Sequence, residues 1–587
     1  MRVMLSFSIL LPFLLGGIAA RAAAAAPRQV YEVKCEPDVT MKTRDGVTLN
    51  ADIYRPVQDG QYPVILRRSP YGKQRAAAEA MATAARGYIY ISQDVRGRET
   101  SGGEWYPFKY EAADGYDAVE WAAALPYANG KVAMISGSYE GITQMFAATA
   151  APPHLVAIYP GVTPSDMYGQ LVYNDGAFML ALAQAWSGAL SVGEFNRRVA
   201  PAANPEYWAK HLPLSDYPML SIPDLRGVGQ YYHDWLKHPT FDAYWKEFSF
   251  EQQYEKIKIP VLHYGAWYDV FQVGSLRNYM GLKRRGGSDA ARNGQRLIMV
   301  PGGHAGAGPK IADVDFGKDS VFPSWEYGMR WFDWHLKGID DGISQEKPVK
   351  LFIMGENVFR DEDDWPLARA ISTRYHLHSA GRANTAKGDG LLSTEPPQAE
   401  PADRFVYDPA NPAPTIGGAT LGILNPPPGP VDQAQANARE DMLVYTTPPF
   451  AQPTEVTGPL SLDAYVSSSV EDTDLVGKVI DVAPDGRAIL LTEGVLRLRY
   501  RNSFAKPELM VPGQIYRVSL DLWATANLFK AGHRLQLVVT GSSFPRYDRH
   551  PNHGGDLSGV THPVKATTVI HHDREHPSAL ILPVIPR

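Results

Sequence analysis

One serine lies in a sharp turn between an apolar strand and a helical segment, and this stretch constrains the fold most. Residues 131–151 read KVAMISGSYEGITQMFAATAA, a short run of β-formers, then small residues, then helical composition. A larger side chain near the apex would collide where strand and helix cross. Ser138 is placed at that apex by its small neighbours Ser136, Gly137 and Gly141. The pattern predicts strand, turn and helix, although a Gly/Ser turn without chemistry has the same local signature.

The length and composition indicate several globular domains. At 587 residues the chain exceeds one core and should divide into two to four domains. Its 44% apolar and 20% charged residues are ordinary for a globular protein, and 52 glycines with 47 prolines suggest many turns and a sizeable all-β portion. The net charge of −6 and the pI near 6.3 give no electrostatic reason to expect a nucleic-acid partner.

The N-terminus has the pattern of a secretory signal peptide. Arg2 precedes an apolar run over residues 4–18, and an alanine-rich tract follows as far as residue 26. We expect cleavage between Ala20 and Ala26, which makes residues 1–26 the signal peptide and implies a periplasmic or secreted protein with no membrane attachment after cleavage. An uncleaved anchor is the alternative, but the run is near the short limit for spanning. The single cysteine, Cys35, can form no intramolecular disulfide.

Strands alternate with helices over the first 355 residues, apart from one interruption. This alternation predicts a parallel sheet covered on both faces. A hairpin is expected at 39–54, a helix at 110–125 and another at 325–336, with strands at 62–68, 87–94, 132–135, 155–159, 259–264, 296–300 and 349–354. Residues 161–254 lack apolar strand runs and are rich in Trp, Tyr and Phe, which predicts a helical cap inserted over the sheet.

The C-terminal part changes to short strands separated by Pro-rich turns, with no helix of convincing length. Strands are expected at 370–378, 443–447, 454–466, 475–482, 488–501, 515–523, 534–540 and 566–571. This pattern is typical of a β-sandwich or jelly roll. The predicted organisation is therefore an α/β domain in two parts (27–160 and 255–355), the cap (161–254) and an all-β domain (356–587).

Three polar residues, each following a predicted strand, suggest nucleophilic catalysis. A serine hydroxyl needs a neutral imidazole to remove its proton, and the imidazole needs a carboxylate to fix its tautomer. Ser138, Asp269 and His304 occur in the chain order serine, acid, histidine, separated by 131 and 35 residues. The first interval is long enough for the cap, and the second for one helix between two strands. Strand C-terminal ends are where open α/β sheets hold their sites.

The sequence also resembles the cocaine-esterase-like branch of the α/β hydrolases, which includes Xaa-Pro dipeptidyl peptidases, α-amino-acid ester hydrolases and cephalosporin acylases. The matching stretches are RRSPYGK (67–73), QDVRGRETSGGEW (93–105), DGYDAVEWAAALPYANGKVAMISGSYEGITQ (114–144), GAWYDVF (265–271), PGGHAG (301–306) and TGSSFPRYDRHPNHGG (540–555). The resemblance implies an α/β-hydrolase domain with an inserted helical cap and a C-terminal jelly roll. It further implies that Ser138 is the nucleophile, Asp269 the acid and His304 the base. Tyr71 would be the oxyanion donor, together with the backbone N–H of Tyr139.

Two departures from the family pattern bear on the function. Ser136 stands where the family usually has glycine, which adds some backbone strain to the turn. Val270 and Phe271 stand where α-amino-acid ester hydrolases have a Glu–Asp pair that helps to bind the substrate's ammonium group. This difference weakens any reading that requires a free α-amine. The acids of the inserted segment remain candidates for that role: Asp166, Asp175, Asp224 and Asp234.

The sequence therefore predicts an exported serine hydrolase that cleaves an ester, or less readily an amide, through an acyl-enzyme. It implies a small-molecule substrate and no cofactor or metal, and it leaves the oligomeric state, including a homo-oligomer, open. An Xaa-Pro dipeptidyl peptidase is the alternative within the fold. An inert secreted protein that binds through its jelly roll is the alternative from another class.

Overall fold

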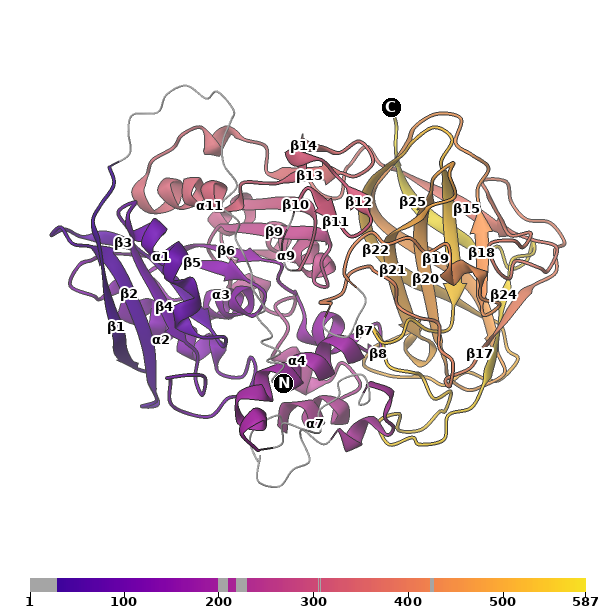
Figure 1. Ribbon diagram of the computed structural model, residues 1–587, viewed down its shortest axis with the longest axis horizontal. Coiled ribbons are helices and arrows are strands. Elements are labelled where there is room, and N and C mark those ends of the chain that lie inside the picture. The colour runs from indigo at the N-terminus through magenta and orange to yellow at the C-terminus, as the bar shows by residue number, and fades with distance from the viewer. Residues whose placement is uncertain (1–28, 199–208, 218–229, 305, 307, 423–426) are drawn as a thin grey trace, which may run out of the picture.

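The computed structural model describes residues 29–198, 209–217, 230–304, 306, 308–422 and 427–587. The predicted signal peptide, residues 1–26, lies outside these ranges. Figure 1 shows an α/β region at the N-terminal end of the colour scale, a β-rich region at the C-terminal end, and helices of the inserted segment beside both. No helix among the described residues combines the length and apolar character needed to cross a membrane.

The α/β region is built on one ten-stranded sheet within the described residues. Its core from β4 to β13 is parallel, and β1, β2 and β14 pair antiparallel at the edges. In spatial order the strands are β1 (Val33–Lys42), β2 (Thr48–Pro56), β4 (Ile89–Asp94), β3 (Tyr62–Ser69), β5 (Ala128–Gly137), β6 (Leu155–Gly161), β9 (Val261–Tyr268), β10 (Gln295–Gly303), β13 (Val349–Ile353) and β14 (Val358–Glu362). The predicted hairpin and parallel strands are confirmed.

Helices cover both faces of this sheet, as predicted. Helices α2 (Glu111–Ala123) and α3 (Tyr139–Ala150) pack with Leu66, Met134 and other strand residues in one buried cluster. On the opposite face α1 (Ala77–Ala84) and α11 (Ser324–Phe332) pack against the alternate side chains of the same strands. Further elements are α9 (Gln272–Arg285), α10 (Asp289–Asn293), a π-helical turn (Asp333–Lys337) and the small strands β11 (Lys310–Ile311) and β12 (Val314–Asp315).

The sheet extends beyond the predicted boundary at residue 355. Strand β14 forms an antiparallel hairpin with β13, so the α/β sheet continues to Glu362. The sequence VFRDE lacks an apolar face, and β14 is an edge strand on which Asp361 is exposed while the buried Glu362 pairs with Arg360 and Arg369. The expectation that 349–354 is the last strand was therefore wrong.

The inserted segment between β6 and β9 is mainly helical where it is described. It contains a π-helical turn (Tyr168–Val172), α4 (Leu180–Arg198), α7 (Gln230–Lys237) and α8 (Ala243–Lys246). Its only strands in the described part, β7 (Tyr173–Asn174) and β8 (Ala177–Phe178), form a two-residue pair. Most of its described aromatic side chains join the cluster that contains α2 and α3 and are therefore core.

The C-terminal region consists of β-strands and turns, with no α-helix among its described residues after 356. Eleven strands form one hydrogen-bonded network there, antiparallel except between β16 and β18. In path order they are β17 (Asp403–Tyr407), β24 (Ala566–His571), β19 (Thr454–Ser468), β25 (Ala579–Ile585), β15 (Ile371–His378), β16 (Leu391–Ser393), β18 (Met442–Thr446), β23 (Arg534–Thr540), β20 (Asp474–Val482) and β21 (Ala488–Arg497), with β22 (Tyr516–Phe529) paired to β19. All eight expected strands are present, and β16, β17 and β25 are additional.

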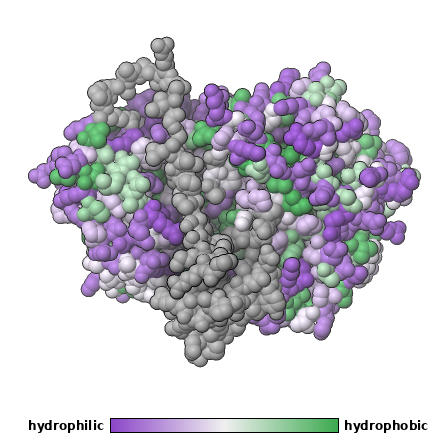
Figure 2. Space-filling view, viewed as in Figure 1, coloured by the Kyte–Doolittle hydropathy of each residue, from purple (hydrophilic) through white to green (hydrophobic). Residues whose placement is uncertain are grey.

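The two regions share one buried core. Trp267 and Leu351 of the α/β region pack in the same cluster as many side chains of the β region. Gln272 Nε2 at the start of α9 donates to the carbonyl of Ala524 in β22 at 2.8 Å, and Tyr268 Oη donates to Leu490 at 3.0 Å. On the face shown in Figure 2, hydrophobic residues are scattered among hydrophilic ones outside the grey atoms.

Candidate active site

The turn that holds Ser138 is strained in the way its small neighbours predict. Ser138 lies between β5 and α3 with φ 60° and ψ −131°, a conformation that L-residues rarely adopt. Its N–H donates to the carbonyl of Gly161 at 2.9 Å, which joins the apex to β6. A Cβ on Gly141 would lie 1.9 Å from Thr163 Oγ1, so only glycine lets α3 pack this closely. The predicted strand, turn and helix are thus observed.

Ser136 carries the additional strain that its departure from glycine implies. Its φ is 109°, outside the range that suits a side chain. The Ser136 hydroxyl donates to the buried carboxylate of Glu140, which also accepts from Ser69 Oγ at 2.7 Å and from Arg67 Nε at 3.1 Å. Ser69 Oγ in turn accepts from the N–H of Tyr71 at 3.1 Å. This network ties the serine turn to the loop after β3.

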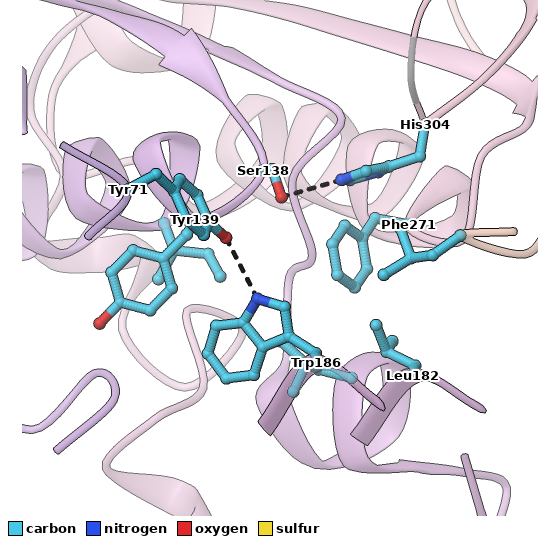
Figure 3. A pocket seen from close by; sticks show the side chains of 10 residues that line it. Tyr71, Ser138, Tyr139, Leu182, Trp186, Phe271 and His304 are labelled. Atoms are coloured by element: carbon cyan, nitrogen blue, oxygen red, sulfur yellow. Dashed lines mark hydrogen bonds between the residues drawn. The ribbon is translucent and has the colours of Figure 1, made fainter. Parts of the chain in front are cut away.

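His304 bridges Ser138 and Asp269. Asp269 follows β9 directly and His304 follows β10, at the C-terminal edge of the sheet. His304 Nε2 lies 2.8 Å from Ser138 Oγ (Figure 3). His304 Nδ1 lies 2.6 Å from Asp269 Oδ1. Asp269 is fully buried. The Phe271 ring packs edge-on against the imidazole of His304, with 5.3 Å between the two ring centroids. Three residues separated by 131 and 35 positions therefore form one continuous hydrogen-bonded chain.

Tyr71 places its phenol at the same site. It follows β3, and its oxygen accepts a hydrogen bond from Trp186 Nε1 at 3.1 Å (Figure 3). Burial raises the pKa of the Tyr71 phenol to about 12, against a smaller opposing effect of hydrogen bonds with Trp186 and Ser138. The phenol therefore keeps its proton at neutral pH and has a hydrogen to donate.

The backbone of Tyr139, rather than the end of its ring, lies next to Ser138. It is the first residue of α3, and the first N–H groups of a helix have no partner within the helix. The ring points away from Ser138 in Figure 3, and its hydroxyl donates to Glu111 Oε1 at 3.0 Å. The Tyr139 N–H thus lies beside Ser138 at the positive end of a helix dipole.

A small hollow, partly open to solvent, lies beside Ser138. Its lining draws on three parts of the chain, and it is apolar apart from Ser138, His304 and the tyrosines. The residues are Tyr71, Ser138, Tyr139, Ile142, Leu171, Leu182, Trp186, Phe271, His304 and Leu421. None of these described lining residues is an acid, a lysine or an arginine. The hollow therefore suits an uncharged apolar group beside the serine.

The sequence missed most of the pocket wall. Ile142, Leu171, Leu182 and Leu421 carry no motif, and a leucine on a helix or loop cannot be distinguished from core by its pattern. Conversely, three aromatic residues of the stretches that resemble the family, Trp267, Phe544 and Tyr547, do not line the hollow. Trp267 Nε1 donates to the carbonyl of Phe352, Tyr547 Oη donates to Asn174, and Phe544 packs on the neighbouring cluster.

The described candidate acids of the inserted segment lie away from the hollow. Asp166 accepts from the N–H of Gly169, and Asp234 accepts from Tyr106 Oη at 3.0 Å. Asp175 sits at the β7–β8 turn, and none of the three lines the hollow. Asp224 lies outside the described residues. Within those residues no group of three His, Cys, Asp or Glu side chains is placed to hold a metal ion.

Comparison with known proteins places both regions in one family. Residues 45–306 match the model for X-Pro dipeptidyl-peptidase (S15 family), and residues 341–581 match the X-Pro dipeptidyl-peptidase C-terminal non-catalytic domain. The chain is 36% identical to cocaine esterase of Rhodococcus sp. (strain MB1 Bresler), over 94% of this chain and 98% of that protein. It is 27% identical to the putative serine esterase Mb1866c of Mycobacterium bovis, over 93% and 94% of the two chains.

Solved structures support the same fold. An aminopeptidase from a marine sediment Thaumarchaeota archaeon superimposes with a TM-score of 0.81 at 23% identity, covering 97% of this chain and 99% of that one. An α-amino acid ester hydrolase gives 0.79 at 24% identity, with coverage of 96% and 98%. The α/β fold, its largely β C-terminal domain and the relatives in sequence define this protein as a serine hydrolase. The chain belongs to the cocaine-esterase-like (CocE/NonD) family.

Proposed function

We propose that the protein is an exported esterase that hydrolyses carboxylic esters with uncharged, apolar acyl groups through an acyl-enzyme on Ser138. One observation carries this proposal: the hydrogen-bonded chain Ser138–His304–Asp269 opens into a hollow whose other walls are apolar. A serine held against an imidazole, with a buried carboxylate behind it, is the arrangement that makes a hydroxyl nucleophilic at neutral pH.

We infer a role for each group from this geometry. Because Nδ1 of His304 faces the Asp269 carboxylate, that nitrogen carries the proton and Nε2 accepts the proton of Ser138 as the hydroxyl attacks the ester carbon. The Tyr71 phenol and the Tyr139 N–H stabilise the oxygen of the tetrahedral intermediate. His304 then returns the proton to the leaving alcohol, and a water molecule activated in the same way releases the acid.

The lining of the hollow favours an ester with a neutral acyl group over an Xaa-Pro peptide. Release of a dipeptide from a free N-terminus requires recognition of an ammonium group, which a buried apolar wall disfavours. None of the ten described lining residues is an acid, and apolar Val270 and Phe271 follow Asp269. The relatives in sequence are named as esterases, whereas the family model over residues 45–306 is that of X-Pro dipeptidyl-peptidase, so the choice between the two substrates rests on this lining.

The surrounding architecture completes the proposal. We infer that the helical segment 161–254 acts as a cap, since it supplies Leu171, Leu182 and Trp186 to the hollow. The C-terminal domain is proposed to be a jelly roll, which supports the cap and contributes Leu421. Export follows from the N-terminal signal pattern and remains a prediction of the sequence.

A substrate comparison tests this function. We expect p-nitrophenyl butyrate and benzoate to be hydrolysed with a kcat/KM at least 10²-fold above that of Ala-Pro-p-nitroanilide, and Ser138→Ala to abolish both activities. If Ala-Pro-p-nitroanilide is the better substrate, the esterase proposal is wrong and the protein is a dipeptidyl peptidase. Full ester hydrolysis by Ser138→Ala would refute the assignment of the nucleophile.

A further inference from the structure

Trp186 makes one polar contact that the reaction described above does not use. Its indole Nε1 donates to the phenolic oxygen of Tyr71 at 3.1 Å, across the hollow from Ser138 (Figure 3). The phenol belongs to the α/β domain, whereas Trp186 lies on α4 of the inserted segment. An indole N–H is a donor only, so the direction of this hydrogen bond is fixed.

We propose that Trp186 is a positioning residue that directs the Tyr71 phenol toward the oxyanion, so that the inserted helix α4 completes the oxyanion hole. This inference rests on the proposed function of Tyr71. A phenol oxygen carries one proton and accepts through its lone pairs. With the Trp186 N–H on one side of that oxygen, the phenolic proton must point elsewhere, and Ser138 lines the same hollow as the phenol.

The indole is held rigidly enough to perform this role. Three aromatic rings lie nearly parallel to it, with interplanar angles of 4° to Phe108, 16° to Trp235 and 21° to Tyr139. Trp186 is only 9% exposed. Because these rings fix the plane of the indole, they also fix the direction of its N–H. A donor oriented before the reaction costs no reorganisation in the transition state.

The two partners are also tied together through the backbone. Arg98 donates from Nε to the carbonyl of Pro70, next to Tyr71, and from Nη1 to the carbonyl of Leu190 on α4, both at 3.0 Å. At the start of α4, the N–H of Ala181 donates to the carbonyl of Pro545 in the C-terminal domain at 3.0 Å. The distance between the indole and the phenol is therefore set by contacts from both sides.

The hydrogen bond that the phenol oxygen accepts from Trp186 also strengthens the hydrogen bond that the phenol donates. A hydroxyl that accepts a hydrogen bond is polarised and donates a stronger one. The hydrogen bond from Trp186 lowers the pKa of Tyr71 against the larger effect of burial, which is the expected direction. Orientation and polarisation both act on the transition state, so loss of the N–H should reduce kcat rather than raise KM.

A double-mutant cycle tests the inference. Trp186→Phe keeps an aromatic ring and removes the N–H, and we expect it to lower kcat for p-nitrophenyl acetate about tenfold with KM within twofold. In a Tyr71→Phe background the same change should cost less than twofold, because the hydroxyl on which it acts is gone. Trp245→Phe is the matched control, because it removes another indole N–H of the inserted segment, one that donates to the carbonyl of His238 and does not line the hollow, and it should keep kcat within twofold.

The alternatives give different results. If Trp186 only forms the acyl wall, Trp186→Phe will cause an equal loss in both backgrounds and will alter the ratio of acetate to benzoate hydrolysis. That outcome, or an unchanged kcat, overturns the inference while loss of activity in Ser138→Ala and Tyr71→Phe still supports the proposed function. If Tyr71→Phe itself keeps full kcat, Tyr71 is not an oxyanion donor and Trp186 has no such donor to position, so both assignments fail.

Thermal unfolding of each variant checks the fold. Should Trp186→Phe unfold, 3-benzothienylalanine at position 186, in which sulfur replaces the N–H, removes the donor while the ring shape stays. The same tenfold loss in kcat is expected from this replacement. Wild-type kcat with the benzothienyl ring in place overturns the inference.

Discussion

Replacing Gly141 by alanine is a sharp test of the strained turn, because the structure gives the size of the disturbance. The new Cβ would lie 1.9 Å from Thr163 Oγ1 and 3.2 Å from the Gly161 carbonyl oxygen. Non-bonded atoms are comfortable near 3.5 Å, so about 1.5 Å of separation must be created. Thr163 Oγ1 donates to the Gly161 carbonyl at 2.7 Å, which limits its retreat. The start of α3, with Ser138, must therefore move.

A displacement of about 1 Å at a reacting group can cost about 10²-fold in rate. We expect Gly141→Ala to lower kcat/KM for p-nitrophenyl butyrate by about this factor, and the unfolding free energy by about 1–3 kcal/mol from overpacking. Adding Thr163→Ala to Gly141→Ala removes the atom closest to the new Cβ. The double variant should have a kcat/KM at least tenfold above that of Gly141→Ala alone.

The matched control is Gly161→Ala, whose Cβ would have its nearest neighbour, Gly137 Cα, at an ordinary 3.6 Å. This variant should retain activity within about threefold, since no atom has to move. Wild-type kcat/KM and melting temperature in Gly141→Ala, or no recovery with Thr163→Ala, would refute the reasoning about the turn.

Two further predictions concern stability. Burial lowers the pKa of His263 to about 4, below its ordinary value of 6.5, so the unfolded state binds a proton first and stability is lost as the pH falls from 6.5 toward 4. Chemical unfolding at pH 7 and pH 5 measures this loss. Between the two pH values the wild type should lose about 2 kcal/mol more unfolding free energy than His263→Gln, and an equal loss in both proteins would show that His263 is not its source. Asp548 accepts from buried Arg497 at 2.7 Å and from the N–H of Phe178, two residues before α4, at 3.1 Å. Asp548→Ala should therefore lower the unfolding free energy by roughly 3 kcal/mol and reduce kcat as well, whereas loss of stability alone would show that α4 does not depend on this contact.

The sheet and its polar edge could be predicted because their signals are local. Short apolar runs followed by Ser138, Asp269 and His304 mark strands and their C-terminal ends, and parallel strands bring those ends to one edge. The structure places these three side chains in contact for that reason. The family resemblance adds Tyr71, which no periodicity would have singled out.

The remaining features depend on contacts between distant segments. Leu182 and Leu421 line the hollow only because the inserted segment and the C-terminal domain meet there, and neither belongs to a motif. The Trp186–Tyr71 hydrogen bond spans 115 residues and depends on how α4 is held. Strand β25 was missed because Pro583 interrupts its apolar run, a pattern that argues against a strand.

The most direct test of the account is to locate the reactive nucleophile. The folded protein is treated with a fluorophosphonate, and the modified peptide is identified by mass spectrometry. We predict one label per chain on Ser138, much slower labelling in His304→Ala, and none in Ser138→Ala. Labelling of another residue, or no labelling of protein that still hydrolyses p-nitrophenyl butyrate, would contradict the account.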